Sequence, residues 1–178
     1  MITKATRLFV AFLLIVWFAA AVQYASAGTG GIGPGGTDSQ VTRSGVFPLR
    51  AAHTYGDGIG AGRGHQGQDL MAKCGKSVRA AQAGRVEVVA YQGSGAGNYV
   101  VIRGARRTFD YVYMHMLERA SVREGQRVAA GDRIGLVGST GRSTACHLHF
   151  EMWSAPGWYE GGSVEDPTPY LKRWDPHE

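Results

Sequence analysis

The stretch Cys146-His147-Leu148-His149-Phe150-Glu151-Met152-Trp153 decides the fold of this chain. In an extended strand, residues i and i+2 lie on the same face. His147 and His149 can therefore point at one small object, while Leu148 and Phe150 point toward a core. This alternation predicts a β-strand with a polar face and an apolar face.

A second polar fragment, His65-Gln66-Gly67-Gln68-Asp69, offers a histidine and a carboxylate. Its glycine favours a loop or a strand edge over a helix. Two histidines and one carboxylate form a ligand set of catalytic zinc sites, in which water takes the fourth position. The sequence therefore predicts one Zn²⁺ per chain, bound by this fragment and by one histidine of His147-Leu148-His149. Glu151 shares the histidine face, where it either orients a metal ligand or is an ordinary surface carboxylate.

Runs of alternating residues punctuated by glycine predict an all-β, mainly antiparallel fold. The predicted strands cover residues 84–91, 98–103, 108–116, 133–137 and 146–153. No stretch of ten or more residues after the first 27 has convincing helical periodicity. In residues 110–116, the alternation places Tyr111, Tyr113 and His115 on one face.

The N-terminus has the organisation of a signal peptide over residues 1–27, with basic residues, an apolar run and Ala25-Ser26-Ala27. The apolar run is shorter than the about 20 residues that span a bilayer, so we expect no stable membrane insertion after cleavage, with an uncleaved anchor as the alternative. Residues 28–45 are rich in glycine and predict a flexible linker. Residues 46–174 have the size of one domain, followed by a tail over 175–178.

The formal net charge is +5, and it includes Lys4 and Arg7 of the leader. A mildly basic mature chain suits an anionic cell envelope. The sequence contains none of the motifs typical of nucleic-acid-binding proteins, so we expect no nucleic-acid partner.

Cys74 and Cys146 are the chain's two cysteines. Export to an oxidising compartment predicts a disulfide between them, with two free buried thiols as the alternative. Such a bridge would join the two fragments that supply metal ligands. Cys146 is disfavoured as a zinc ligand, since on a strand it faces away from His147 and His149.

Four motifs, in this order, resemble the lysostaphin-like (LytM-type) zinc metallopeptidases of the M23 family, which are peptidoglycan endopeptidases. The motifs are His65-Gln66-Gly67-Gln68-Asp69-Leu70, Tyr113-Met114-His115-Met116, Gly138-Ser139-Thr140-Gly141-Arg142-Ser143-Thr144 and His147-Leu148-His149-Phe150-Glu151. The resemblance implies a single-domain β-sandwich or barrel-sandwich-like core with a groove that holds the zinc site. It also implies an enzyme that cuts peptidoglycan peptides. From the predicted leader we expect this enzyme to be secreted, and we expect it to be a monomer. A catalytically silent wall-binding or amidase-activating regulator of the same fold is the alternative.

The resemblance also implies a role for individual residues. The implied zinc ligands are His65, Asp69 and His149, and the implied catalytic histidines are His147 and His115. Some relatives use a tyrosine to steady the substrate, and the candidates for this role here are Tyr55 and Tyr113.

Overall fold

The computed structural model describes residues 45–177. The predicted signal peptide over residues 1–27 lies outside this range, as does nearly all of the predicted linker over residues 28–45. The domain boundaries therefore remain predictions. Within the described range, no helix is long and apolar enough to cross a membrane.

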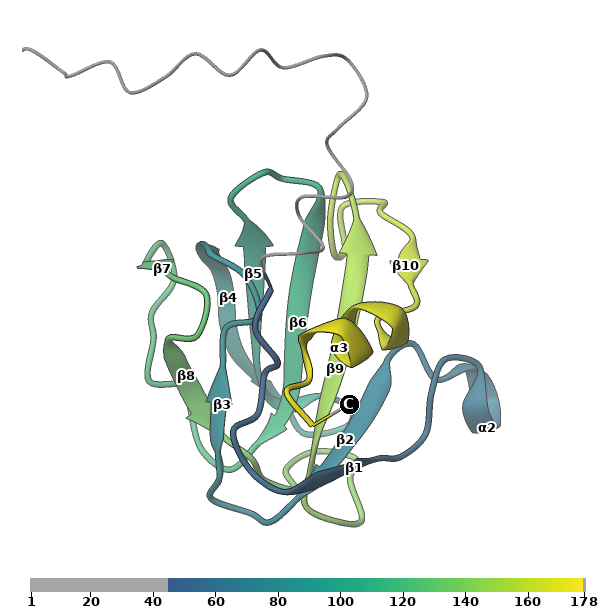
Figure 1. Ribbon diagram of the computed structural model, residues 1–178. Helices are drawn as coiled ribbons and strands as arrows, with labels where there is room; N and C mark the ends of the chain where they lie inside the picture. The colour runs from purple at the N-terminus through teal and green to yellow at the C-terminus, as the bar shows by residue number, and fades with distance from the viewer. Residues whose placement is uncertain (1–44, 178) are drawn as a thin grey trace, which may run out of the picture. The chain divides into compact units, whose positions relative to one another are not determined.

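Eight strands form the main sheet, in the order β1-β2-β9-β6-β5-β4-β7, with β10 also paired to β9 (Figure 1). Every strand pairing between residues 45 and 177 is antiparallel, as the sequence predicted. The strands of this sheet are β1 (His53–Tyr55), β2 (Gln68–Ala72), β4 (Gly84–Gln92), β5 (Gly97–Gly104), β6 (Phe109–Met116), β7 (Arg127–Val128), β9 (His147–Ser154) and β10 (Val164–Glu165).

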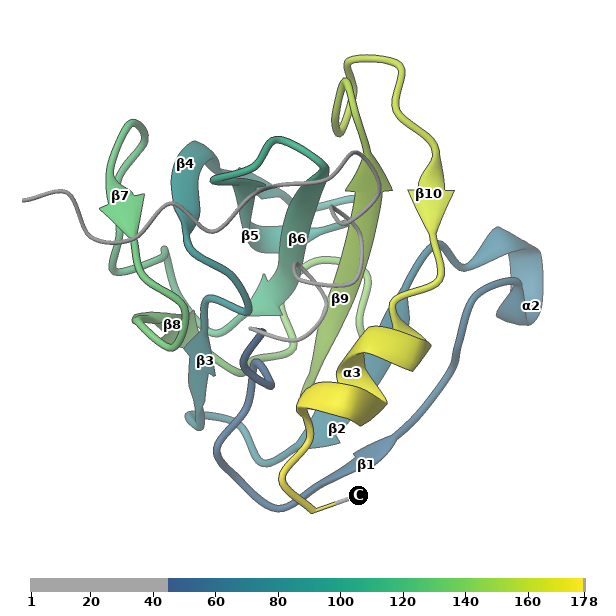
Figure 2. The same ribbon diagram turned by 45° about the horizontal axis from the view of Figure 1, so that its top comes forward.

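A smaller sheet and two short helices complete the described fold (Figure 2). The small sheet pairs β3 (Ser77–Arg79) with β8 (Arg133–Leu136). The helices are α2 (Ala61–Gly64), which precedes β2, and α3 (Thr168–Trp174), which follows β10. The five predicted strands correspond to β4, β5, β6, β8 and β9, each to within one or two residues at either end.

The core lies between the main sheet on one side and the small sheet with α3 on the other. Strand β9 contributes Leu148 and Phe150, both 0% exposed, as their alternation predicted. Val78 of β3, Ile134 of β8 and Leu171 of α3 belong to the same buried cluster. The opposite face of β9 therefore stays available for His147 and His149.

The end of the chain is fixed to the first strand. His53 Nε2 lies 2.8 Å from Asp175 Oδ2, and the two side chains are only 4% and 2% exposed. Asp175 stands at the start of the predicted tail, yet it is part of the packed structure.

Candidate metal centre

Strand pairing brings Asp69 and His149 together. Strands β2 and β9 are antiparallel neighbours, and Asp69 lies directly opposite His149 in their register. Because directly opposed residues share a face of the sheet, their side chains meet. Asp69 Oδ1 lies 2.9 Å from His149 Nδ1.

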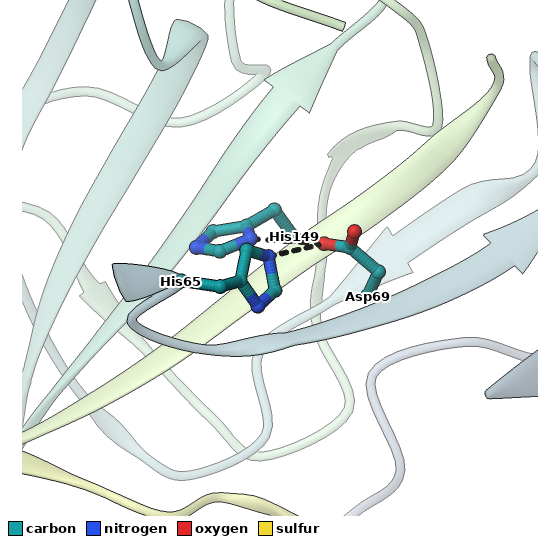
Figure 3. Close-up of side chains that lie close together, drawn as sticks. All are labelled: His65, Asp69 and His149. Carbon is teal, nitrogen blue, oxygen red and sulfur yellow. Dashed lines mark hydrogen bonds and ion pairs between the residues drawn. The ribbon is translucent and has the colours of Figure 1, made fainter. Parts of the chain in front are cut away.

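His65 completes a cluster with these two residues (Figure 3). It follows α2, and its Nε2 lies 3.1 Å from Asp69 Oδ1. Gly67 lets this segment approach β9 closely, since a Cβ there would collide with the carbonyl oxygen of Phe150. The ligand atoms of His65, Asp69 and His149 all lie within 4.8 Å of one another. Within residues 45–177, this is the one group of three such side chains close enough to hold a metal ion.

The second ring nitrogen of each histidine has an oxygen acceptor. His65 Nδ1 lies 3.0 Å from the Gly58 carbonyl oxygen, and His149 Nε2 lies 2.9 Å from Glu151 Oε1. Trp153 Nε1 donates to the other Glu151 oxygen at 2.7 Å. These contacts leave His65 Nε2 and His149 Nδ1 for a metal, as outer partners of metal-bound histidines do. Glu151 is only 4% exposed, which rules out the surface-carboxylate alternative.

The cluster has strongly coupled charges. Burial by itself raises the pKa of Asp69, but the hydrogen bond with His149 and the neighbouring His147 and His65 hold it below its usual value. Burial lowers the pKa of His149, but hydrogen bonds to Asp69 and Glu151 outweigh it and raise this pKa to about 9. The carboxylates therefore favour a positive charge at this position, and a divalent cation can take the place of the proton.

Two further histidines lie beside the cluster. His147 Nδ1 donates to the Ala145 carbonyl oxygen at 2.9 Å, and its Nε2 lies 3.6 Å from Asp69 Oδ1. His115 Nδ1 donates to the Thr140 carbonyl oxygen at 2.8 Å. The rings of His115 and His147 are 4.8 Å apart between centroids. Each histidine thus has its Nδ1 proton fixed by a carbonyl group, and its Nε2 makes no hydrogen bond to the backbone of residues 45–177.

His115 lies off the core side, as predicted, but the prediction that it shares a face with Tyr111 and Tyr113 is wrong. Tyr113, with which it was expected to share a face, points into the core, whereas Met114 lies opposite His149. His115 has a left-handed backbone with φ of 63°, which interrupts the alternation of the strand. As a result His115 lines the groove on the metal side, and Met116 enters the core.

The structure also corrects the two predicted substrate-binding tyrosines. Tyr113 is 0% exposed, and its hydroxyl accepts a hydrogen bond from the Ala81 N–H at 2.8 Å. Tyr55 lies opposite Leu70 in the β1–β2 register and therefore on the core face. Its hydroxyl donates to Asp175 at 3.4 Å. Neither side chain reaches the groove, since both point away from the metal face of the sheet.

The metal cluster lies in a groove of about 770 Å³. The motif over residues 138–144 contributes one wall of this groove. Sequence reasoning missed the turn between β4 and β5 as a second contributor, because a turn far away in the chain has no local signal for such a role. Besides the histidines and carboxylates, the lining comprises Gln66, Gln92, Gly95, Ala96, Met114, Gly141, Arg142, Ser143, Thr144, Trp153, Trp158 and Tyr159.

The predicted disulfide is confirmed. Cys74 and Cys146 are bridged, with a Cα–Cα distance of 5.2 Å and a sequence separation of 72. The bond connects the segment after β2 to the residue before β9. It therefore joins the two strands that carry Asp69 and His149, and it excludes Cys146 as a metal ligand.

Reduction of this disulfide is expected to lower the free energy of unfolding by about 2–5 kcal/mol, because the bond closes a long loop in the unfolded chain. Urea unfolding of the oxidised protein, the reduced protein and a Cys74→Ser, Cys146→Ser variant would measure the effect. The variant controls for side effects of the reductant, since its stability should not respond to it. Equal stability of oxidised and reduced wild-type protein would contradict the prediction.

Comparison with known proteins supports the same assignment. The sequence profile of peptidase family M23 matches residues 63–165. Glycyl-glycine endopeptidase ALE-1 of Staphylococcus capitis is 36% identical over 118 residues, which cover 66% of this chain and 32% of that protein. Peptidoglycan DD-endopeptidase ShyC of Vibrio cholerae is 42% identical over 90 residues, which cover 51% of this chain and 20% of that protein. The structure of the catalytic domain of the antimicrobial peptidase lysostaphin from Staphylococcus simulans matches with a TM-score of 0.61 and 32% identity, over 67% of this chain and 92% of that chain.

The chain spans less than a third of the length of these two curated relatives. It covers nearly all of the lysostaphin catalytic domain, in agreement with the predicted lysostaphin-like β fold. The family match extends over more than half of the chain and includes His65, Asp69 and His149. The chain therefore belongs to peptidase family M23.

Proposed function

We propose that this chain is a secreted zinc-dependent endopeptidase that hydrolyses peptide bonds in peptidoglycan stem peptides or cross-bridges. The observation that carries the proposal is the cluster of His65, Asp69 and His149 in a groove that also holds His147 and His115. The two curated relatives named above are endopeptidases, and one is named for peptidoglycan. A catalytically silent regulator has no need of all five side chains in one groove.

The donor set fits zinc. Two imidazole nitrogens and one carboxylate oxygen are ligands that catalytic zinc sites use, with the fourth position left for water or substrate. Bound zinc would polarise a carbonyl group and lower the pKa of its water toward about 7. His65 Nε2, Asp69 Oδ1 and His149 Nδ1 would hold the ion, and Glu151 and the Gly58 carbonyl group would orient the two rings.

We assign the removal of a proton from the attacking water to His147. Its Nδ1 proton is directed to the Ala145 carbonyl oxygen, so Nε2 carries the lone pair that accepts a proton. This Nε2 lies 3.6 Å from Asp69 Oδ1, at the edge of the metal cluster. The position suits a general base that must reach a water in the same groove.

We assign proton transfer to the leaving amine to His115. Burial, together with the neighbouring His147 and His149, lowers its pKa to about 4 despite the hydrogen bond to the Thr140 carbonyl oxygen. His115 Nε2 would take over the proton that His147 removes from the water, which returns His147 to its neutral form, and would give this proton to the more basic leaving amine. The 4.8 Å between its ring centroid and that of His147 keeps the two proton carriers close together.

The proposed location rests on one observation and one prediction. The disulfide between Cys74 and Cys146 is typical of oxidising compartments outside the cytoplasm. The predicted leader over residues 1–27 supplies a route of export. The five residues of the proposed site need no contribution from a second subunit, and we propose that the protein acts as a monomer.

The proposal predicts zinc-dependent cleavage. Incubation of the purified protein with defined peptidoglycan fragments is expected to produce new amine ends with zinc present and none with a chelator, with activity restored by added zinc. Mass spectrometry of the fragments would detect the new ends and identify the bond. Intact fragments from several wall chemistries, in the presence of protein with bound zinc, would favour the regulator.

A further inference from the structure

The loop before β9 holds Arg142 in a defined place at the groove. The Arg142 N–H donates to the Gly95 carbonyl oxygen at 2.8 Å. The preceding Gly141 has φ of 73°, and a Cβ there would collide with the backbone of Gly95 and Gly97. The Thr140 hydroxyl donates to the Met116 carbonyl oxygen at 2.7 Å. The loop is thus docked on the β4–β5 turn and on the end of β6, so the backbone of Arg142 is fixed while its side chain is exposed.

Arg142 stands between two hollows. It lines the metal groove, and it also lines a second hollow of about 390 Å³ beside α2. His65 lines both hollows as well, so Arg142 belongs to the immediate surroundings of a proposed zinc ligand. Gly62 and Gly64 line the second hollow.

The guanidinium group of Arg142 has no partner within the described part of the chain. Among the groove-lining residues whose side chains the structure describes, Arg142 is the one arginine or lysine. The groove's two carboxylates are already engaged, since Asp69 contacts the histidines and Glu151 binds His149 and Trp153. No salt bridge or side-chain hydrogen bond between residues 45 and 177 involves Arg142. An unpaired guanidinium beside a cationic metal site is suited to an anionic group on the substrate.

We propose that Arg142 binds a free carboxylate of the substrate next to the scissile bond. This inference rests on the proposed function and narrows it to cross-links in which the amine side is a diamino acid with a free α-carboxylate, such as diaminopimelate. In these links, the carbon that carries the scissile nitrogen also carries the carboxylate. The planar guanidinium matches a carboxylate through two parallel hydrogen bonds. A glycine bridge has no free carboxylate within its chain. The named relatives include both a glycyl-glycine endopeptidase and a DD-endopeptidase, so membership of the family does not decide between these two substrate classes.

The test uses two cross-linked peptides that differ only at this carboxylate, which is free in one and a carboxamide in the other, together with pentaglycine. Zinc-loaded wild-type protein is expected to cleave the free-carboxylate peptide with a kcat/KM about 10- to 100-fold higher than the carboxamide, as expected for a charge-assisted hydrogen bond. Arg142→Gln should lose this preference through a higher KM for the free-carboxylate peptide alone. Arg142→Lys should restore part of this preference, because lysine keeps the positive charge but cannot form the two parallel hydrogen bonds of a guanidinium. Arg123→Gln is the matched control, since Arg123 is exposed and lines neither hollow.

A binding measurement separates this inference from the proposed function. Calorimetry with the same peptides and zinc-loaded protein reports carboxylate-dependent affinity even if no bond is cut. Loss of that dependence in Arg142→Gln would support the role of Arg142, even for a protein without turnover. Three results would overturn the inference. Wild-type protein could bind and cleave the two peptides with equal affinity and kcat/KM, or Arg142→Gln could lower kcat/KM equally for both. The third is a higher kcat/KM for pentaglycine than for the free-carboxylate peptide.

Discussion

Replacement of Asp69 by Ala is expected to abolish zinc binding and peptide cleavage together. The Asp69 Oδ1 atom is the common partner of the cluster, at 3.1 Å from His65 Nε2, 2.9 Å from His149 Nδ1 and 3.6 Å from His147 Nε2. In the variant, the imidazoles of His65 and His149 have no carboxylate between them to help bind a cation. Its loss of zinc affinity should exceed the about 10- to 100-fold loss that follows removal of an outer partner of a metal ligand.

The zinc affinity of Glu151→Gln serves as the reference against which the loss in Asp69→Ala is compared. Glu151 contacts His149 Nε2 at 2.9 Å and does not belong to the group of three candidate ligands. Its replacement should weaken zinc binding by about 10- to 100-fold and leave some activity at saturating zinc. Competition with a chromophoric chelator would give both affinities, and the fragment assay would give both rates. Asp57→Ala, at an exposed carboxylate outside the groove, should match wild type.

Circular dichroism and urea unfolding in the presence of chelator would show whether Asp69→Ala still folds. The Asp69 side chain is 17% exposed, and it lies outside the hydrophobic core, so a folded variant is expected. Zinc bound by this variant with wild-type affinity would show that Asp69 is not a ligand.

The long strands could be predicted from the sequence because alternation over eight or nine residues is a clear signal. Strands β4, β5, β6 and β9 have eight or nine residues each. Strands β1, β2 and β3 have three to five residues, too few for a periodic pattern, and they were not predicted. The segment Thr168–Trp174 was also missed as a helix, since seven residues span only two turns.

The residues that form the site could be predicted from the sequence, but the positions of their side chains could be predicted only in part. The pattern of His147 and His149 required only one strand. The contact between His149 and Asp69 depends on the pairing of β2 with β9, which joins residues 80 apart in the sequence. The place of His115 depends on a left-handed backbone at a residue other than glycine, for which the sequence has no signal. Tyr55 was misplaced because the register of the short β1 strand decides its face.

Replacement of His147 by Ala is expected to keep zinc and lose turnover. His147 is outside the group of three candidate ligands, so zinc content should stay near one per chain. Loss of a general base should lower kcat by about 10²- to 10⁴-fold. His115→Ala should also keep its zinc and lose turnover. Its kcat should fall most for substrates that have a more basic leaving amine, because such amines depend most on protonation. Metal analysis of dialysed protein and single-turnover rates would measure the two properties separately.

The exposed His177 offers a matched control for both variants, because His177→Ala removes an imidazole away from the groove. The dependence of kcat/KM on pH gives a further readout, since a variant without the general base should lose the acidic limb of the profile. A His147→Ala protein that binds zinc and cleaves at the wild-type rate would show that another group removes the proton. If His147→Ala and His115→Ala each retained zinc, and only His115→Ala lost the acidic limb, the two roles would be exchanged. The hydrogen bonds that fix both Nδ1 protons would then support His115 as the base, because its Nε2 is equally prepared to accept a proton.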